Sequence, residues 1–208
     1  MGRPEANWAR RLAMMQLGNG LHEADHYEDA LAVREAELSM LRRLGDSEEH
    51  ILVTQGNLAL TYAALGHLEK ALSMERDVYS GFLKLHGEED ERTLQAALNY
   101  AGGLASLQRS KAVKALMRIK IPVARRVLGE NAETTLRMRN YYAAALCNDE
   151  CATLGELREA VTTLEDTTRI ARRVLGSAHP HTTVIEGALQ HARAALRARE
   201  TQPPPRSA

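Results

Sequence analysis

The sequence predicts an all-α protein, a right-handed solenoid of about four helical hairpins closed by one further helix at the C-terminus. The segment ARRVLG occurs at residues 124–129 and again at 171–176, 47 residues later. Only 4% of the residues are aromatic, which suits stacked helices built from Ala and Leu. Glycines that close predicted helices recur after 42, 42 and 47 residues, a period typical of a repeat array: Gly45, Gly87, Gly129 and Gly176.

Two further patterns follow the same period. DHYEDAL at 25–31 resembles GHLEKAL at 66–72, and GELREAV at 155–161 has the same pattern. Three threonines each lie six residues after the glycine of the preceding copy: Thr93, Thr135 and Thr182. The repeated unit is therefore a pair of helices rather than a single element.

Each copy begins with a polar connection that supplies N-cap and first-turn acceptors. An amphipathic first helix follows, and a longer second helix ends on Arg or Lys and then glycine, which suits an αL cap and the helix macrodipole. We expect helices at 6–17, 27–43, 51–65, 68–85, 92–107, 110–128, 134–149 and 156–174, with a capping helix at 182–199. The copies span 6–45, 46–87, 88–129 and 130–176, and residues 1–200 form one repeat domain, with a disordered tail at 201–208.

Three features interrupt the regular pattern. Gly18-Asn19-Gly20 is expected to end the first helix, because two glycines so close together disfavour helix. Pro122 lies inside a predicted helix and should kink its axis. The five extra residues of the fourth copy fall within 147–155, where they either lengthen the first helix of that copy by more than a turn or form a protruding loop.

Composition excludes several classes of function. Lys plus Arg equals Asp plus Glu at 27 each, so no net field attracts nucleic acid or a membrane surface. No apolar run reaches the roughly 20 residues that a membrane span needs. Cys147 and Cys151 cannot build a disulfide framework, and we expect ordinary thiols in a reduced, cytoplasmic protein without a cofactor.

Several motifs resemble those of a known family. LGSAHPHT at 175–182, NLALTY at 57–62 and GHLEKAL at 66–72 are similar to the tetratricopeptide repeats of kinesin light chains. The resemblance covers residues 7–199, and it includes no long heptad segment of the kind that joins a kinesin light chain to its motor. It implies a peptide-binding scaffold and does not imply a role in transport.

In such repeats the first helices line the concave side, and the resemblance implies a groove there. Aligning the copies on their glycines places three residues at one equivalent position of the first helices: Asn57, Asn99 and Tyr141. Asn140 lies one residue before this position. Four residues earlier on the same helical face lie Val53, Gln95 and Arg137. An Asn at this place in related repeats can hold a peptide backbone, or it can simply set the packing of neighbouring helices. Arg137 would favour an acidic peptide.

A basic stripe is expected on the second helix of the third copy. Its members lie close to one helical face: Lys111, Lys114, Arg118 and Arg125. The stripe is either a solvated outer face or a docking surface for an acidic partner. Because second helices form the outer wall of such stacks, it should not line the groove.

One motif raises the alternative of an enzyme. His22-Glu23-x-x-His26 has the spacing by which a helix presents two imidazoles to zinc. The glycine and third histidine of the longer zinc-protease pattern are replaced by Asp29 and Ala32. We therefore expect a solvated turn, and a non-catalytic scaffold for a protein or peptide partner. The alternatives are a self-assembling structural module and, less favoured, a zinc-dependent hydrolase.

Overall fold

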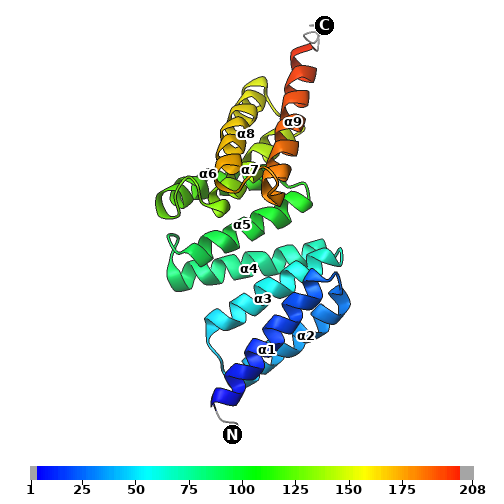
Figure 1. The fold of residues 1–208 in the computed structure, drawn as a ribbon, viewed down its shortest axis with the longest axis vertical. Helices are drawn as coiled ribbons and strands as arrows, with labels where there is room; N and C mark the ends of the chain where they lie inside the picture. The colour runs from blue at the N-terminus through cyan, green and yellow to red at the C-terminus, as the bar shows by residue number, and fades with distance from the viewer. Residues whose placement is uncertain (1–3, 202–208) are drawn as a thin grey trace. The chain divides into compact units, whose positions relative to one another are not determined.

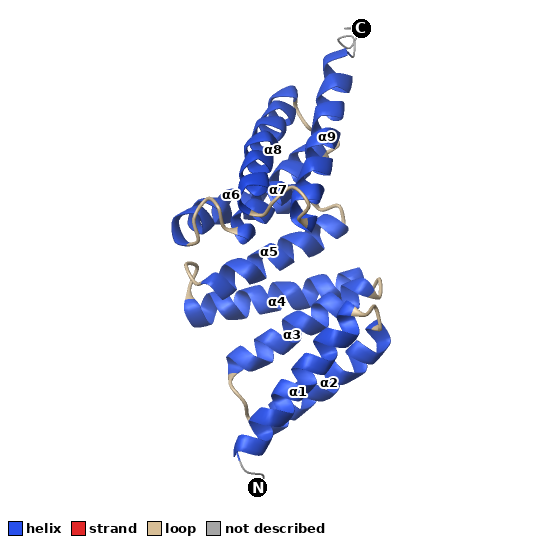
Figure 2. Ribbon diagram, viewed as in Figure 1, coloured by secondary structure: helices blue, strands red, loops and turns tan. Residues whose placement is uncertain are grey.

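The described part of the chain is entirely helical. A computed structural model describes residues 4–201, and within this range it contains helices joined by turns and loops and no strand (Figures 1 and 2). The helices are α1 (Pro4–Glu23), α2 (Tyr27–Leu44), α3 (Glu48–Ala64), α4 (Leu68–His86), α5 (Glu91–Ser106), α6 (Ser110–Val127), α7 (Glu133–Cys147), α8 (Leu154–Val174) and α9 (Pro180–Thr201). The expected all-α class is confirmed. The tail was expected at 201–208, but Thr201 belongs to α9, and residues 202–208 lie outside the described residues.

The chain divides into two compact units between Gly103 and Leu104, inside α5, and within each unit successive helices pack against one another. In the first unit α1 contacts α2, α2 contacts α3, and α3 contacts α4. In the second unit α6 contacts α7, α7 contacts α8, and α8 contacts α9 (Figure 1). A further contact joins α7 to α9, which are two first helices of successive hairpins. The expected single domain over 1–200 stays a prediction.

Helix ends confirm the role expected of the periodic glycines. Gly45 caps α2 in the left-handed conformation, and its N–H donates to the carbonyl of Arg42. Gly87 follows α4 directly, and Gly129 and Gly176 lie two residues after α6 and α8, all with positive φ. A residue with a Cβ is strained at such angles, so glycine sets where each second helix ends.

The periodic threonines belong to the core. Thr93, Thr135 and Thr182 are fully buried near the beginnings of α5, α7 and α9. Around them the core is built mostly from Ala and Leu, as the low aromatic content predicts. In the first unit Leu52, Val78, Phe82 and Ala96 form one such cluster, contributed by α3, α4 and α5.

The prediction that Gly18-Asn19-Gly20 ends the first helix is wrong, because α1 continues to Glu23. A tertiary contact explains the difference. A Cβ on Gly18 would lie 3.2 Å from Cγ of Arg34, so the glycine gives this buried side chain room beside α1. Asn19 Oδ1 then accepts a hydrogen bond of 3.0 Å from Arg34 Nη2.

The extra residues of the fourth copy form a loop and do not lengthen the helix. α7 ends at Cys147 and α8 begins at Leu154, which leaves the inserted loop, residues 148–153, between them. α6 continues through Pro122, and the kink expected there stays a prediction.

Candidate functional site

The residues expected to line a groove fall in both units. α3 carries Val53 and Asn57, and α5 carries Gln95 and Asn99. α7 carries the other three, which belong to the second unit: Arg137, Asn140 and Tyr141. The two sets are described separately below.

In the first unit, Val53 lines a small cavity of about 220 Å³. The other lining residues come from α1, α2 and α3: Arg11, Leu12, Met15, Glu37, His50 and Thr54. Glu37 is buried, and burial raises the pKa of its carboxyl, although a hydrogen bond from Thr54 opposes the shift. The cavity thus combines apolar side chains with polar and charged ones, among them one buried carboxyl.

The amides of the first unit are partly engaged by the chain itself. Gln95 Nε2 donates a hydrogen bond of 3.0 Å to Asn99 Oδ1, one turn further along α5. The backbone carbonyl of Asn57 accepts a bond of 2.7 Å from Arg34 Nη1. Asn57 therefore anchors α2 through its main chain, while its half-buried side chain makes no hydrogen bond within residues 4–201.

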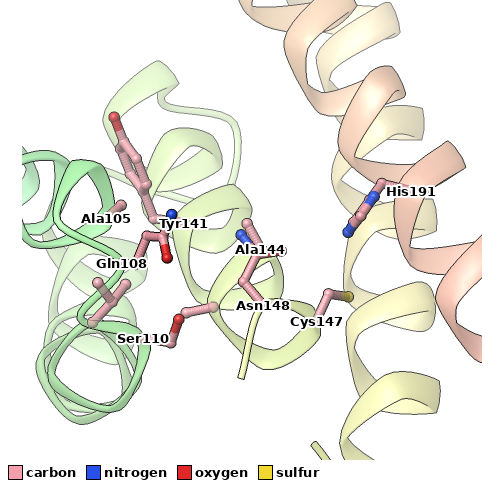
Figure 3. Close-up of a pocket in the computed structure, with 10 residues that line it drawn as sticks. Ala105, Gln108, Ser110, Tyr141, Ala144, Cys147, Asn148 and His191 are labelled. Carbon is pink, nitrogen blue, oxygen red and sulfur yellow. The ribbon is translucent and has the colours of Figure 1, made fainter. Parts of the chain in front are cut away.

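In the second unit, Tyr141 lines a cavity of about 410 Å³, which we call the main cavity because a predicted groove residue lines it (Figure 3). A cavity of about 530 Å³ between α8 and α9 is larger, but no predicted groove residue lines it. The volume of the main cavity is typical of small-ligand pockets, which span roughly 300–1,000 Å³. Tyr141 and Cys147 come from α7, and His191 comes from α9. The remaining lining residues are Ala105, Gln108, Ser110, Val113, Ala144, Ala145 and Asn148.

The main cavity is lined without Asp, Glu, Lys or Arg. Cys147 is half-buried, and burial raises the pKa of its thiol to about 11, so the thiol stays protonated at neutral pH. A protonated thiol is a poor nucleophile, and Cys147 acts as a small lining group rather than a reactive one.

Asn140 and Tyr141 are neighbours on α7 but lie in different surroundings. Tyr141 reaches the main cavity, whereas Oδ1 of Asn140 is buried and has no hydrogen-bond partner in the described chain. Tyr141 is therefore the better placed of the two to meet a ligand.

Arg137 lies in a small charged cluster. Its Nη1 is 3.8 Å from Glu133 Oε1, and the same carboxylate is 3.0 Å from Nε2 of His181. Burial and then the charge of Arg137 lower the pKa of His181. Glu133 thus partly neutralises the positive charge that the sequence places here.

Three members of the expected basic stripe make contacts within the chain. Lys114 Nζ is 2.6 Å from Asp149 Oδ2 and 3.0 Å from Glu156 Oε1. Arg118 Nε donates to the Tyr142 hydroxyl at 3.2 Å, and Arg125 pairs with Glu130. These contacts reduce the charge available to a partner, and a docking role for the stripe stays a prediction.

His22 and His26 do not share one helix. α1 ends at Glu23 and α2 begins at Tyr27, so His26 lies in the turn between them. His22 Nδ1 is 3.5 Å from Arg34 Nη1, and burial and then this cation lower the pKa of His22. Across residues 4–201, no three His, Cys, Asp or Glu side chains gather as metal ligands. The local geometry does not fit the zinc motif.

Several lining residues have no counterpart in the sequence prediction. Gln108 lies in the turn before α6, and Ser110 is the first residue of α6. Asn148 belongs to the inserted loop, and His191 lies on α9. The alignment of copies by their glycines could not find them, since it compares only the first helices of the repeats. The insertion at 147–155 was the one available signal.

None of the helices in the described range combines the length and apolar character that crossing a membrane requires.

A family model and several solved structures are similar to this chain. The family model of the tetratricopeptide repeat matches residues 51–91 and 152–181. The chain is similar to a crystal structure of nearly identical TPR-like repeats of a kinesin-light-chain-type protein from Podosopora anserina, with a TM-score of 0.73 and 19% identity. That match covers 96% of this chain and 91% of the other, and a single-residue variant gives 0.75 with the same identity and coverage.

Another solved structure has a lower similarity to this chain. BtubC (BKLC) from P. vanneervenii matches with a TM-score of 0.55 and 13% identity, over 94% of this chain and 83% of the other. The comparison with curated protein sequences finds no match. At these identities the structural matches establish the fold, and they confirm the predicted solenoid of helical hairpins.

Proposed function

The chain carries tetratricopeptide repeats in a fold like that of kinesin-light-chain repeats, and we propose that it is a non-catalytic scaffold that binds a peptide segment of a partner protein. Repeats of this type support a role in protein–protein interaction. The narrower statement, that a peptide binds beside the first helices, is our inference. We further expect binding to take place in the cytoplasm.

The main cavity is the single observation that carries the proposal. It lies beside α7 and α9 and has the size of a ligand pocket. Its lining combines small apolar groups with amide, hydroxyl and imidazole groups. A peptide offers one N–H and one C=O at nearly every residue, so such a lining can hold its backbone.

The acidic character expected of the partner is a narrower part of the proposal. It rests on Arg137, which is half-buried on α7 and near its neighbour Glu133. A carboxylate of the partner would have to compete with Glu133 for the guanidinium. Electrostatic attraction of this kind weakens with salt, whereas packing in the main cavity does not.

A displayed library of random peptides tests the proposal. Peptides selected on the purified protein are synthesised, and their Kd values are measured by fluorescence anisotropy for the wild type and for Tyr141→Ala. Loss of the aromatic group among the lining residues should weaken binding by about tenfold or more. Val184→Ala is the matched control, because Val184 is exposed on α9 and does not line the main cavity.

Two results would contradict the proposal. The first is that no peptide is selected, and the second is that selected peptides bind both variants as they bind the wild type. Sedimentation of the free protein separates peptide binding from the alternative of self-assembly, which predicts a species larger than the monomer. Circular dichroism verifies that both variants keep the helical content of the wild type.

A further inference from the structure

Glu75 is a buried acid that the proposed peptide site does not use. It lies on α4, and only 5% of its surface is exposed. Its Oε2 has no hydrogen-bond partner in the described chain, and no ion pair within residues 4–201 involves it. Because an unpaired charge is costly at such a place, the carboxyl fits there only in its neutral form.

A glycine of α5 makes the space for this carboxyl. A Cβ on Gly103 would overlap Glu75 Oε2 and would lie 3.1 Å from its Cδ. Gly102 precedes Gly103, and each glycine inside a helix costs about 1 kcal/mol relative to alanine. α5 ends at Ser106, so the carboxyl packs against a weak last turn of this helix, residues 103–106.

The charged groups of the neighbouring helices lie away from this carboxyl. α3 carries no charged residue beyond His50, and α5 carries none beyond Arg92, which is its second residue. The charged residues nearest to it on α4 are exposed: Glu69, Lys70, Arg76 and Asp77. Burial is accordingly the cause that raises the pKa of Glu75 from 4.5 to about 7.

The last turn of α5 leads directly into the lining of the main cavity. Ala105 belongs to this turn, and Gln108 and Ser110 follow it (Figure 3). The next turn is bonded to carbonyls of the last turn of α5. The N–H of Gln108 donates to the carbonyl of Ala105, and the N–H of Arg109 donates to that of Leu104, both at 2.9 Å. Residues that line the cavity therefore keep their places only while residues 103–106 stay helical.

We propose that ionisation of Glu75 opens the last turn of α5 and thereby weakens peptide binding at the main cavity. A carboxylate requires water or N–H donors, and an opened turn supplies both, because its backbone N–H groups lose their helical partners. The neutral acid fits the closed turn without them. The inference rests on the proposed function and adds a form of regulation to it.

The pKa values of Glu75 set the range in which pH acts. In the closed turn the pKa is about 7, and relief from burial returns it toward 4.5. Ionisation therefore begins to favour the open turn above about pH 4.5, and the effect is nearly complete above pH 7. Across that range the ratio of open to closed turns rises by up to about 300-fold. The closed turn and tight binding are expected at pH 5, and the open turn and weaker binding at pH 8.

Amide hydrogen exchange tests the opening without any peptide. Protection factors, which correct for the intrinsic effect of pH on exchange, are measured for residues 101–109 at pH 5 and pH 8. We expect protection in the wild type to be about tenfold or more lower at pH 8. In Glu75→Gln it should be equal at both pH values, because the amide does not ionise. Glu69→Gln is the matched control, since Glu69 is exposed on the same helix, and it should behave as the wild type.

Anisotropy titrations test the effect on binding. The probe is a peptide selected on the wild type that has blocked ends and no ionisable side chain. Its Kd for the wild type should be about threefold or more higher at pH 8 than at pH 5, and this change should be absent in Glu75→Gln. His191 also lines the main cavity, but it is present in both proteins, so the difference between them reports Glu75. Circular dichroism at both pH values verifies the fold.

The outcomes separate this inference from the proposed function. If protection in the wild type does not fall at pH 8, or falls equally in Glu75→Gln, the opening is overturned. If the turn opens and the Kd does not follow, the regulation of the main cavity is overturned. In either case, peptides whose affinity depends on Tyr141 leave the scaffold function standing. If the library selects no peptide, the proposed function fails together with its regulation, and hydrogen exchange still decides whether Glu75 opens the turn.

Discussion

Lys114 of α6 lies 2.6 Å from Asp149 of the inserted loop, and it is also bonded to Glu156 at the beginning of α8. The ammonium thus joins a second helix of the third copy to the insertion of the fourth. The bond to Asp149 raises the pKa of Lys114 and lowers the pKa of Asp149. The pKa of Glu156 is lowered by the backbone N–H of Thr153 and then by Lys114. Each of the three groups is therefore held in its charged form.

Replacement of Lys114 should release the inserted loop. In Lys114→Met the two carboxylates lose their shared cation, and we expect amide hydrogen exchange at residues 148–153 to become about tenfold faster or more. Peptide binding at the main cavity should weaken in parallel, because Asn148 moves with the loop. Lys84→Met is the control, since Lys84 is an exposed lysine on α4. Unchanged exchange in Lys114→Met would show that other contacts hold the loop.

Glu75 should make stability depend on pH. Its side chain is buried, one carboxyl oxygen has no hydrogen-bond partner in the described chain, and burial raises its pKa from 4.5 to about 7. The unfolded chain ionises Glu75 from about pH 4.5 upward, whereas the folded chain does so only near pH 7. This contribution to stability is therefore complete below pH 4.5, declines as pH rises to about 7, and is lost above it.

Glu75→Gln tests this expectation, because the amide stays neutral. Urea unfolding should show the variant about 3 kcal/mol more stable than the wild type above pH 7, and nearly equal to it near pH 4.5. Glu150→Gln, in the exposed part of the inserted loop, should show no such dependence. A difference between Glu75→Gln and the wild type that is the same at both pH values would refute the assignment.

Arg34 should be the main polar link that joins α1, α2 and α3. Its side chain is buried and donates to the carbonyl of Asn57 at 2.7 Å, to Asn19 Oδ1 at 3.0 Å and to the hydroxyl of Thr61. Arg34→Met leaves these acceptors without their donor, and we expect a loss of about 2 kcal/mol or more in the free energy of unfolding. Arg43→Met, at an exposed position of the same helix, should cost little. Equal losses in the two variants would argue against this role.

Arg137→Glu should change the affinity for charged peptides and leave the affinity for neutral peptides unchanged. The reversal places two carboxylates together on α7, near His181, and removes the cation proposed to meet an acidic residue. We expect acidic peptides to bind about tenfold or more weakly at low salt, and neutral peptides to bind as before. Anisotropy titrations across a salt series measure both effects. Equal weakening of neutral and acidic peptides would point to a structural change instead.

Helix ends could be predicted from sequence because their causes are local. A glycine with positive φ stops a helix wherever it stands, and Gly45 and Gly87 do so. Gly18 and Gly20 were expected to end a helix and do not, because a tertiary contact is made at Gly18. The space left by Gly18 is filled by Arg34, 16 residues later in the chain, and no local pattern contains that contact.

The candidate site was predictable only where it lies on the repeat. Tyr141 could be found because it occupies the position of Asn57 and Asn99 in its own copy. Gln108, Asn148 and His191 come from a turn, the insertion and the last helix, which no other copy repeats. Their convergence depends on how the chain packs, so neither spacing nor composition could indicate it.

Chemical-shift mapping tests the central claim most directly. The chain of 23.0 kDa is suited to backbone amide spectra, recorded during titration with a selected peptide. The account predicts that the largest shifts cluster at Gln108, Tyr141, Asn148 and His191, the polar lining of the main cavity. Chemical-shift changes confined to the basic stripe around Lys111 and Arg125, with the signals of the cavity residues unchanged, would contradict the account.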